Sequence, residues 1–380
     1  MQPRGYFDYN ASSLLRPQAA AAMTAWMEEG GGNPSSMHAR GRSARQTLEA
    51  ARRSVAELAD GCAPRDVVFT SGATESNNTV MRAVAAAVPQ VTILTSQIEH
   101  HSVLATAAAL EEQGTAIVRL QPRSDGCYDR DEIAALTSRG PSLLCLGQAN
   151  GESGHVLDVD DVVSACAPDT LVHLDVAQAA GRMKLRLGDG IDSLAMSGHK
   201  FGSPPGIGAL MLSPRMRSLL RPLLTGGPQE WSLRAGTPNV IGAAAMGAAA
   251  DAALADMDSE HRRLCALRES LWSTLAAANI DLLRITPPEG LANTLTIAVA
   301  NGNADSLIAA LDLAGFCISS GSACAAGSPE PSHVMRALGI EPRYYGGVLR
   351  ISMGWSTTAD DVEALASALL TAARKAAAAA

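Results

Sequence analysis

A lysine at the end of a predicted strand is the first residue of the sequence whose surroundings suit covalent chemistry. The segment LAMSGHKFGSPPGIGALML places Lys200 after an apolar strand and before a Gly/Pro turn. Small neighbours in an apolar setting favour the neutral amine, which is the form that Schiff-base chemistry requires. Taken alone, Lys200 has a solvated turn lysine as its alternative interpretation.

An aspartate and a glutamine follow another predicted strand. In VHLDVAQAAG the strand closes on Asp175, and Gln178 comes three residues later. Because open α/β sheets bind ligands at the carboxyl edge of their strands, both side chains are expected in one crevice. A buried carboxylate that faces a pyridine nitrogen keeps this nitrogen protonated, which is the pairing that pyridoxal 5′-phosphate needs to act as an electron sink. Without Lys200, a helix cap would be the preferred interpretation of Asp175.

The segment FTSGATESNN, residues 69–78, leads from a strand into a helix through small residues. Free backbone N–H groups at such a helix start bind anions, and small side chains allow a phosphate to approach closely. The residues concerned are Ser71, Gly72, Ala73 and Thr74. An ordinary capped turn between strand and helix is the alternative.

Two further segments carry candidate side chains. In QIEHHSVL, His100 and His101 follow a strand, where one ring is suited to stacking on a planar cofactor or to proton transfer, although a structural role is the alternative. In GGVLRISMG, Arg350 lies within a strand, where its guanidinium is suited to binding a substrate carboxylate through two hydrogen bonds. A surface arginine is the alternative for Arg350.

A single cysteine lies in a run of serine, glycine and alanine that cannot build a core. The stretch ISSGSACAAGSPEPS, residues 318–332, is typical of a flexible, accessible loop, whereas a cysteine kept for packing has apolar neighbours. We therefore expect Cys324 to be a reactive thiol.

Nine segments in the same order resemble the cysteine desulfurases of the NifS/IscS kind, a group of aminotransferase class V enzymes, over nearly the whole chain. This resemblance implies a fold-type I pyridoxal-phosphate enzyme with a large, mostly parallel sheet domain and a smaller α+β domain. It predicts the large domain at residues 15–255 and the small one at 1–14 plus 256–380. The segments are FDYNASS, GNPSSMHARGRSAR, FTSGATESNN, EHHSVL, HLDVAQAAGR, SGHKFGSPPGIGAL, LRAGTPNVIG, SSGSACAAGSPEPSHVMRALG and LRISMG.

The resemblance also implies a role for each candidate in binding pyridoxal 5′-phosphate. Lys200 would hold the cofactor as a Schiff base, Asp175 would pair with the pyridine nitrogen, and Gln178 would form a hydrogen bond with the ring hydroxyl oxygen. His100 would stack on the ring and serve in catalysis. The phosphate would be held by Ala73, Thr74, Ser197 and His199, together with Thr237 of the partner subunit in a homodimer.

For the reaction, the resemblance implies that Asn150 and Arg350 bind the carboxylate of L-cysteine. Cys324 would attack the sulfur of the bound cysteine, become a persulfide, release alanine and pass sulfur to an acceptor protein. A mobile loop around Cys324 fits this transfer, because glycine and serine supply the mobility.

Three departures from the family pattern leave the pathway open. The chain has NGESG at 150–154 where NNETG is usual, ASS at 11–13 in place of ATT, and Trp231 where an arginine is common. The sulfur acceptor is therefore a partner in Fe–S cluster assembly, in tRNA or DNA thiolation, or in a biosynthetic gene cluster. A selenocysteine lyase, a C–S lyase, a transaminase and a non-catalytic scaffold are the competing interpretations.

Alternating helices and short apolar strands are predicted to position these residues. Helical patterns at 42–60, 75–88 and 131–137 alternate with apolar strands, which favours an α/β domain with a largely parallel sheet. Two helical stretches, at 241–257 and 261–278, precede a second series of strands and helices, which suggests a smaller α+β domain. The predicted strands are DVVFT, VTILT, SLLCLGQA, TLVHLD, DSLAMS, IGALML and NTLTIAVA.

Composition favours a globular cytoplasmic protein. The 380 residues are 47% hydrophobic and 18% charged, with a net charge of -8 and no run of Lys or Arg that suits nucleic acid. The apolar stretch at 241–257 is interrupted by Asp251 and Asp256, and the N-terminus lacks an apolar signal core, so no membrane partner is expected. Seven cysteines without a CxxC pair predict free thiols in a reducing compartment and no metal site.

Overall fold

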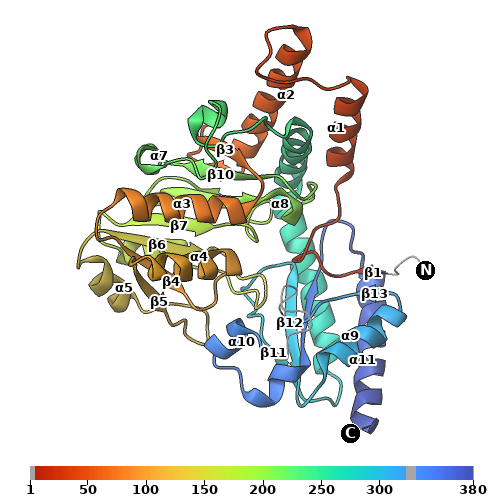
Figure 1. Ribbon diagram of the computed structural model, residues 1–380. Coiled ribbons are helices and arrows are strands. Elements are labelled where there is room, and N and C mark those ends of the chain that lie inside the picture. The colour runs from red at the N-terminus through yellow and green to blue at the C-terminus, as the bar shows by residue number, and fades with distance from the viewer. Residues whose placement is uncertain (1–4, 322–330, 380) are drawn as a thin grey trace.

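A seven-stranded sheet forms the centre of the larger part of the molecule in the computed structural model, which describes residues 5–321 and 331–379 (Figure 1). The strand order is β3-β10-β9-β7-β6-β4-β5, and only β10 runs antiparallel to its neighbours. The strands are β3 (Val67–Thr70), β4 (Thr92–Ser96), β5 (Ala116–Leu120), β6 (Ser142–Gly147), β7 (Leu171–Asp175), β9 (Ser193–Ser197) and β10 (Gly208–Leu212).

Helices cover both faces of this sheet because its central strands are apolar on both sides. In β6, Leu143 and Cys145 pack into one core while Leu144 and Leu146 pack into the other, as the two-residue period of a strand requires. One face is covered by α3 (Ala73–Ala87), α4 (His101–Glu112) and α7 (Pro214–Leu219), and the other by α2 (Ala39–Ala56), α5 (Arg130–Thr137), α6 (Val159–Ala165) and part of α8 (Val240–Ala276). The predicted α/β class with a mostly parallel sheet is confirmed.

A second, smaller core surrounds the sheet β11-β12-β14, which is antiparallel throughout. The N-terminal strand β1 pairs with β13 beside it, so the N-terminal segment joins the C-terminal part of the chain in this region (Figure 1). The elements are β1 (Gly5–Tyr6), β11 (Leu282–Arg284), β12 (Thr294–Val299), β13 (Phe316–Cys317), β14 (Val348–Ser352), α9 (Ala304–Leu313), α10 (His333–Ala337) and α11 (Ala359–Ala379). The remaining elements are α1 (Pro17–Glu28), β2 (Ala59–Asp60) and β8 (Leu185–Arg186).

Helix α8 joins the two cores. Two separate helices were predicted here, which is wrong, because Val240–Ala276 is one continuous helix. No Gly or Pro interrupts the chain between 248 and 276, so nothing in the sequence ends the helix earlier. Residues of its first half, such as Met246 and Ala250, belong to the large core. Residues of its second half, such as Leu264 and Leu271, belong to the small core. The predicted domain boundary at 255/256 therefore falls inside this helix.

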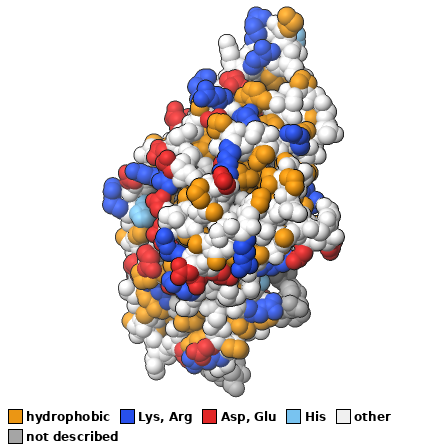
Figure 2. Space-filling model, turned by 90° about the vertical axis from the view of Figure 1, so that its left-hand side faces the viewer, with side chains coloured by type: hydrophobic (Ala, Val, Ile, Leu, Met, Phe, Trp, Pro, Cys, Tyr) orange, Lys and Arg blue, Asp and Glu red, His pale blue; other side chains and the backbone are white. Residues whose placement is uncertain are grey.

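The length and hydropathy of α8 also meet the requirements of a membrane span, and it is the one described helix that does so. Its most apolar window is 56% buried inside the molecule, which a core helix explains. On the face shown in Figure 2, acidic and basic side chains are interspersed.

Candidate active site

A cavity of about 470 Å³ opens where the carboxyl ends of the central strands meet the small core. Strand ends of a parallel sheet form such a crevice because the chain leaves them in loops that turn to opposite faces. Most of the residues predicted from the sequence line it, namely Ala73, Thr74, His100, Asn150, Asp175, Gln178, Ser197, His199, Lys200 and Arg350.

Lys200 ends a single helical turn, Gly198–Lys200, that follows β9 directly. Its Nζ donates hydrogen bonds to the carbonyl oxygens of Asn10, at 2.6 Å, and Ala11, at 3.1 Å. The amine is thus held at the cavity by the N-terminal segment and is not the solvated turn lysine of the alternative interpretation.

Asp175 ends β7 and is 7% exposed. Its Oδ2 accepts a hydrogen bond of 2.7 Å from the amide of Asn77, and its Oδ1 accepts one of 2.9 Å from the backbone N–H of Ala177. Both donors are neutral, so the negative charge of Asp175 is stabilised without being cancelled by them. Such a carboxylate is suited to a cationic ring N–H.

Behind Asp175 lies a hydrogen-bond network that the sequence interpretation missed. The second N–H of the Asn77 amide donates a hydrogen bond of 2.9 Å to Oγ of Ser102. The amide oxygen of Asn77 lies 2.9 Å from Nε2 of His173, so Nε2 carries the ring proton. Nδ1 of His173 lies 2.8 Å from Oγ of Ser193. Burial lowers the pKa of His173 to about 4. A signal was present in the sequence, because Asn77 shares the buried face of α3 with apolar residues.

His100 is the residue before the first turn of α4, and its Nδ1 accepts the backbone N–H of Ser102 at 3.1 Å. This contact leaves the ring proton on Nε2 when the imidazole is neutral. Burial lowers the pKa of His100, and the positive charge of Lys200 also lowers it. A neutral imidazole of fixed orientation therefore faces the cavity, and such a ring is suited to stacking.

The start of α3, where the sequence predicts an anion site, lies beside the end of β9. Oγ of Ser197 accepts the backbone N–H of Ala73 at 2.8 Å, and Thr74 lies exposed in the first turn. His199 lies on the same side, with Nδ1 at 3.2 Å from Oγ of Ser12. Burial, with the charges of Lys200 and Arg182, lowers the pKa of His199 to about 4. The site thus offers neutral hydrogen-bonding groups next to a helix N-terminus.

Arg350 is 4% exposed, so the alternative of a surface arginine is wrong. Strand β14 brings its guanidinium to the cavity, where Nη2 donates to Oδ1 of Asp8 at 2.8 Å and Nη1 donates to the carbonyl oxygens of Gly321 and Gly151. Its Nε is buried and has no hydrogen-bond partner among the described residues. An anionic ligand in the cavity would satisfy donors that the protein leaves incompletely paired.

Asn150 lines the cavity but is largely engaged within its own turn. Its Oδ1 accepts the backbone N–H groups of Glu152, at 2.9 Å, and Ser153, at 2.8 Å, while its Nδ2 donates to the carbonyl of Ile98 at 2.8 Å. An amide nitrogen carries two protons. The predicted contact with a carboxylate thus depends on the second N–H of Nδ2.

Glu99 is a second carboxyl group of the cavity that the sequence interpretation did not select. It is 5% exposed and accepts a hydrogen bond from the backbone of Gly147. Burial, together with the charge of Asp175, raises the pKa of Glu99 to about 8. At neutral pH the carboxyl of Glu99 is therefore mainly protonated. The EHH motif that singled out His100 contains this residue.

One predicted residue, Thr237, does not line the cavity, and another, Cys324, cannot be placed relative to it. Thr237 is exposed on the segment before α8 and lies away from the cavity of its own chain. Cys324 lies outside the described residues. The described residues that flank it do reach the cavity: Gly321 accepts from Arg350, and His333 and Val334 line the cavity wall.

The substituted Trp231 also lies outside the cavity. It stacks on the guanidinium of Arg52, 4.5 Å from the ring centroid, while Arg52 forms a buried ion pair with Glu230 at 2.7 Å. Trp231 thus packs against α2 through Arg52 and is not among the residues that line the cavity.

Comparison with known proteins connects this geometry to a family. The family model described as aminotransferase class-V matches residues 5–365. The chain belongs to the aminotransferase class-V family. The resemblance inferred from the nine motifs is thereby confirmed.

Individual proteins with similar sequences or structures give a more detailed comparison. The chain is 38% identical to a cysteine desulfurase from Cereibacter sphaeroides over 95% of this chain and 94% of that protein. A solved NifS-like protein matches with a TM-score of 0.90 and 31% identity, covering 97% of this chain and 98% of the other. A structure described as SspA in complex with cysteine matches with a TM-score of 0.80 and 30% identity, covering 92% and 98%.

Proposed function

We propose that this protein is a pyridoxal 5′-phosphate-dependent L-cysteine desulfurase. The observation that carries the proposal is that one cavity joins Lys200, Asp175 and His100 from the large sheet to Arg350 from the small one. The first three suit a planar aldehyde cofactor, and Arg350 suits the carboxylate of an amino acid. The similarity to cysteine desulfurases and to a protein solved with cysteine supports this assignment.

The residues of the cavity fit the cofactor in size and chemistry. A volume of about 470 Å³ lies within the range of sites for small ligands and cofactors. Lys200 supplies the amine for the Schiff base, and Asp175, whose two donors are neutral, supplies the charge for the ring nitrogen. When bound, pyridoxal 5′-phosphate supplies an electron sink for the amino acid carbon. His100 offers its ring face, and Ala73, Thr74, Ser197 and His199 surround the phosphate position.

For the substrate, Arg350 binds the carboxylate of L-cysteine, and Asp8 holds the guanidinium in place. Cys324 then takes up the sulfur. The C–S bond of cysteine breaks and an S–S bond forms on Cys324. The thiol of Cys324 gives up a proton and the carbon that loses sulfur gains one, so L-cysteine and the thiol become L-alanine and a persulfide. Gly321 and His333 flank the segment that carries Cys324 and contact the cavity, which supports delivery of this thiol to the substrate.

The proposal extends to assembly and location. A homodimer would bring Thr237 of the partner subunit to the phosphate, and the exposure of Thr237 away from its own cavity supports this arrangement. The sulfur acceptor is a partner protein of Fe–S cluster assembly or of another thiolation pathway, and the enzyme works in the cytoplasm.

The proposed function is tested with purified protein, L-cysteine and a reductant. Alanine and sulfide should appear in equal amounts, whereas a C–S lyase would yield pyruvate and a transaminase would yield a keto acid without sulfide. A selenocysteine lyase would act on selenocysteine and leave cysteine unchanged. Production of alanine from selenocysteine alone would contradict the proposal.

A further inference from the structure

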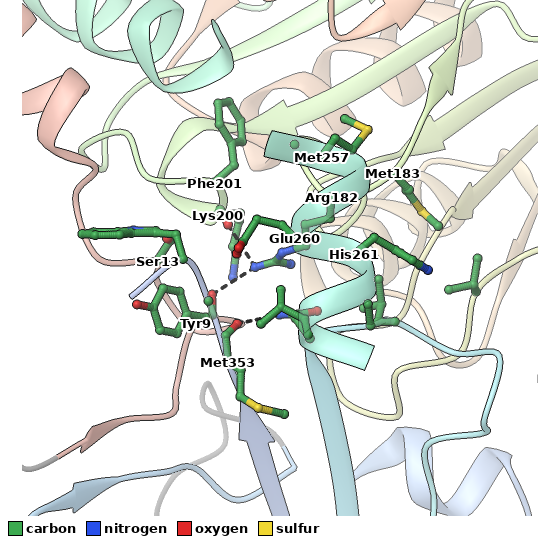
Figure 3. Close-up of a pocket in the computed structure, with 18 of the residues that line it drawn as sticks. Tyr9, Ser13, Arg182, Met183, Lys200, Phe201, Met257, Glu260, His261 and Met353 are labelled. Carbon is green, nitrogen blue, oxygen red and sulfur yellow. Dashed lines mark hydrogen bonds between the residues drawn. The ribbon is translucent and has the colours of Figure 1, made fainter. Parts of the chain in front are cut away.

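Arg182 is a cation beside the cavity whose hydrogen-bond partners are all neutral. Its Nη1 donates to Oε1 of Gln178 at 2.6 Å and to the backbone carbonyl of Gln178 at 3.1 Å, and its Nη2 donates to the carbonyls of Lys200 at 2.9 Å and Tyr9 at 3.3 Å. Figure 3 shows the guanidinium reaching between Lys200 and Tyr9. None of the ion pairs among the described residues includes Arg182. Burial, with the charge of Arg350, lowers the pKa of Arg182 to about 10, so the side chain stays protonated at neutral pH.

The contact with Arg182 decides which way the amide of Gln178 points. A guanidinium has only donors, so the atom at 2.6 Å has to be the amide oxygen. The amide nitrogen of Gln178 then faces the other way and donates to the carbonyl of Asn10 at 3.0 Å. That carbonyl also accepts from Nζ of Lys200. Arg182 thus sets the amide nitrogen on the side of Lys200 and the cavity.

Gly151 leaves room on the other side of the same amide. A Cβ atom at position 151 would lie 2.5 Å from Nε2 and 2.9 Å from Cδ of Gln178, which is closer than such atoms approach. This is the glycine of NGESG, where the family pattern has asparagine. In this chain, a side chain at 151 would displace Gln178, so the orientation that Arg182 gives the amide requires a residue without a Cβ at this position.

We propose that Arg182 is a positioning residue that fixes the amide of Gln178, with the close approach of Gly151, so that its nitrogen donates into the cofactor site beside Lys200. This inference rests on the proposed function, which puts the ring hydroxyl oxygen of pyridoxal 5′-phosphate opposite Gln178. Arg182 follows Gln178 by four residues, about one helical turn. This spacing lets one guanidinium bind both the side-chain oxygen and the backbone oxygen of Gln178.

A double-mutant cycle on cofactor affinity tests the inference. Apo protein is titrated with pyridoxal 5′-phosphate, and the visible absorbance of the bound cofactor gives the dissociation constant for the wild type, Arg182→Met, Gln178→Ala and the double variant. Each single substitution should weaken binding about tenfold, the scale of one hydrogen bond to a charged group. If Arg182 acts through Gln178, the double variant should bind within about threefold of Gln178→Ala.

Matched variants separate positioning from loss of charge. Arg182→Lys keeps one donor and should recover part of the affinity, whereas Arg186→Met, at a half-exposed arginine paired with Asp160, should leave affinity unchanged. Gly151→Ala is the second route, because it should weaken binding in the wild type and have no effect in Gln178→Ala. It also keeps the inference testable where Arg182→Met fails to fold.

The outcomes distinguish this inference from the proposed function. Wild-type protein that binds no pyridoxal 5′-phosphate would defeat the proposed function itself. Wild-type protein that binds it, with Arg182→Met unchanged or with losses that multiply in the double variant, would overturn the positioning role alone. A lower melting temperature of the apo protein with no coupling to Gln178 would likewise assign Arg182 a purely structural role.

Discussion

Asn77 donates a hydrogen bond of 2.7 Å to Oδ2 of Asp175 and thereby ties the first turns of α3 to the end of β7. The same amide contacts His173 and Ser102, so one side chain joins the carboxylate of Asp175 to β7 and α4 of the large core. The carboxylate of Asp175 is therefore held by a buried residue that does not line the cavity.

Replacing Asn77 by alanine should lower the free energy of unfolding by about 1.5–3 kcal/mol, because a buried carboxylate loses a hydrogen bond and His173 loses its acceptor. Urea unfolding of the apo protein measures this loss. Asn78→Ala is the control, since Asn78 bonds only to the carbonyl of Thr74 and the guanidinium of Arg82 within its own helix, and its loss should cost much less. Equal losses for the two variants would contradict the role of the network.

Arg350→Lys should raise KM for cysteine about 10- to 100-fold, because lysine keeps the positive charge opposite Asp8 but loses the planar fork that binds a carboxylate. Steady-state kinetics with saturating cofactor measures the change. Arg343→Lys is the matched control at an exposed arginine paired with Asp281. A normal KM with loss of bound cofactor would assign Arg350 to the cofactor instead.

Protein stability should depend on pH through Glu99. The pKa of this carboxyl rises from 4.5 to about 8 on folding, so between these values the unfolded chain has lost a proton that the folded chain keeps. The folded state binds more protons in this window, and the free energy of unfolding therefore falls as pH rises from about 4.5 to 8.

Glu99→Gln removes this group while its amide oxygen keeps an acceptor for the N–H of Gly147. The difference in stability between the variant and the wild type should grow in favour of glutamine from pH 5 to pH 8, as measured by urea unfolding at each pH. A difference that stays constant across this range would show that Glu99 ionises normally in the folded protein.

A shared active site predicts complementation between two inactive chains. If Thr237 serves the phosphate site of the partner subunit, a heterodimer of Lys200→Ala and Thr237→Ala chains has one site with both defects and one with neither. Mixed subunits should then be more active than the sum of the parent homodimers, provided that Thr237→Ala alone is impaired. Verified heterodimers without recovery would place Thr237 in its own chain's site.

The sequence was sufficient to predict the local elements and the cavity residues that belong to ordered motifs. Strand ends such as Asp175 and Ser197 can be predicted because a short, mostly apolar run stops at a polar residue. The continuity of α8 was not predicted, since Asp and Ser at 256–259 resemble a helix boundary until the packing of two cores on one helix is known.

Residues that act through long-range contacts were the ones missed. Asn77 and His173 meet only when α3 packs on β7, and Arg182 meets Lys200 only across the loop between β7 and β9. The pKa of Glu99 depends on burial that no local pattern reports. These residues required the three-dimensional structure because their partners lie far away in the sequence.

The central claim is that sulfur from L-cysteine is transferred to Cys324. The most direct measurement is mass spectrometry of the holoenzyme after reaction with L-cysteine in the absence of reductant. The account predicts that the peptide containing Cys324 gains the mass of one sulfur atom while alanine is released, and that Cys324→Ala binds cysteine but releases no alanine. A sulfur atom found on Cys317 or another thiol, with alanine release unchanged in Cys324→Ala, would contradict the account.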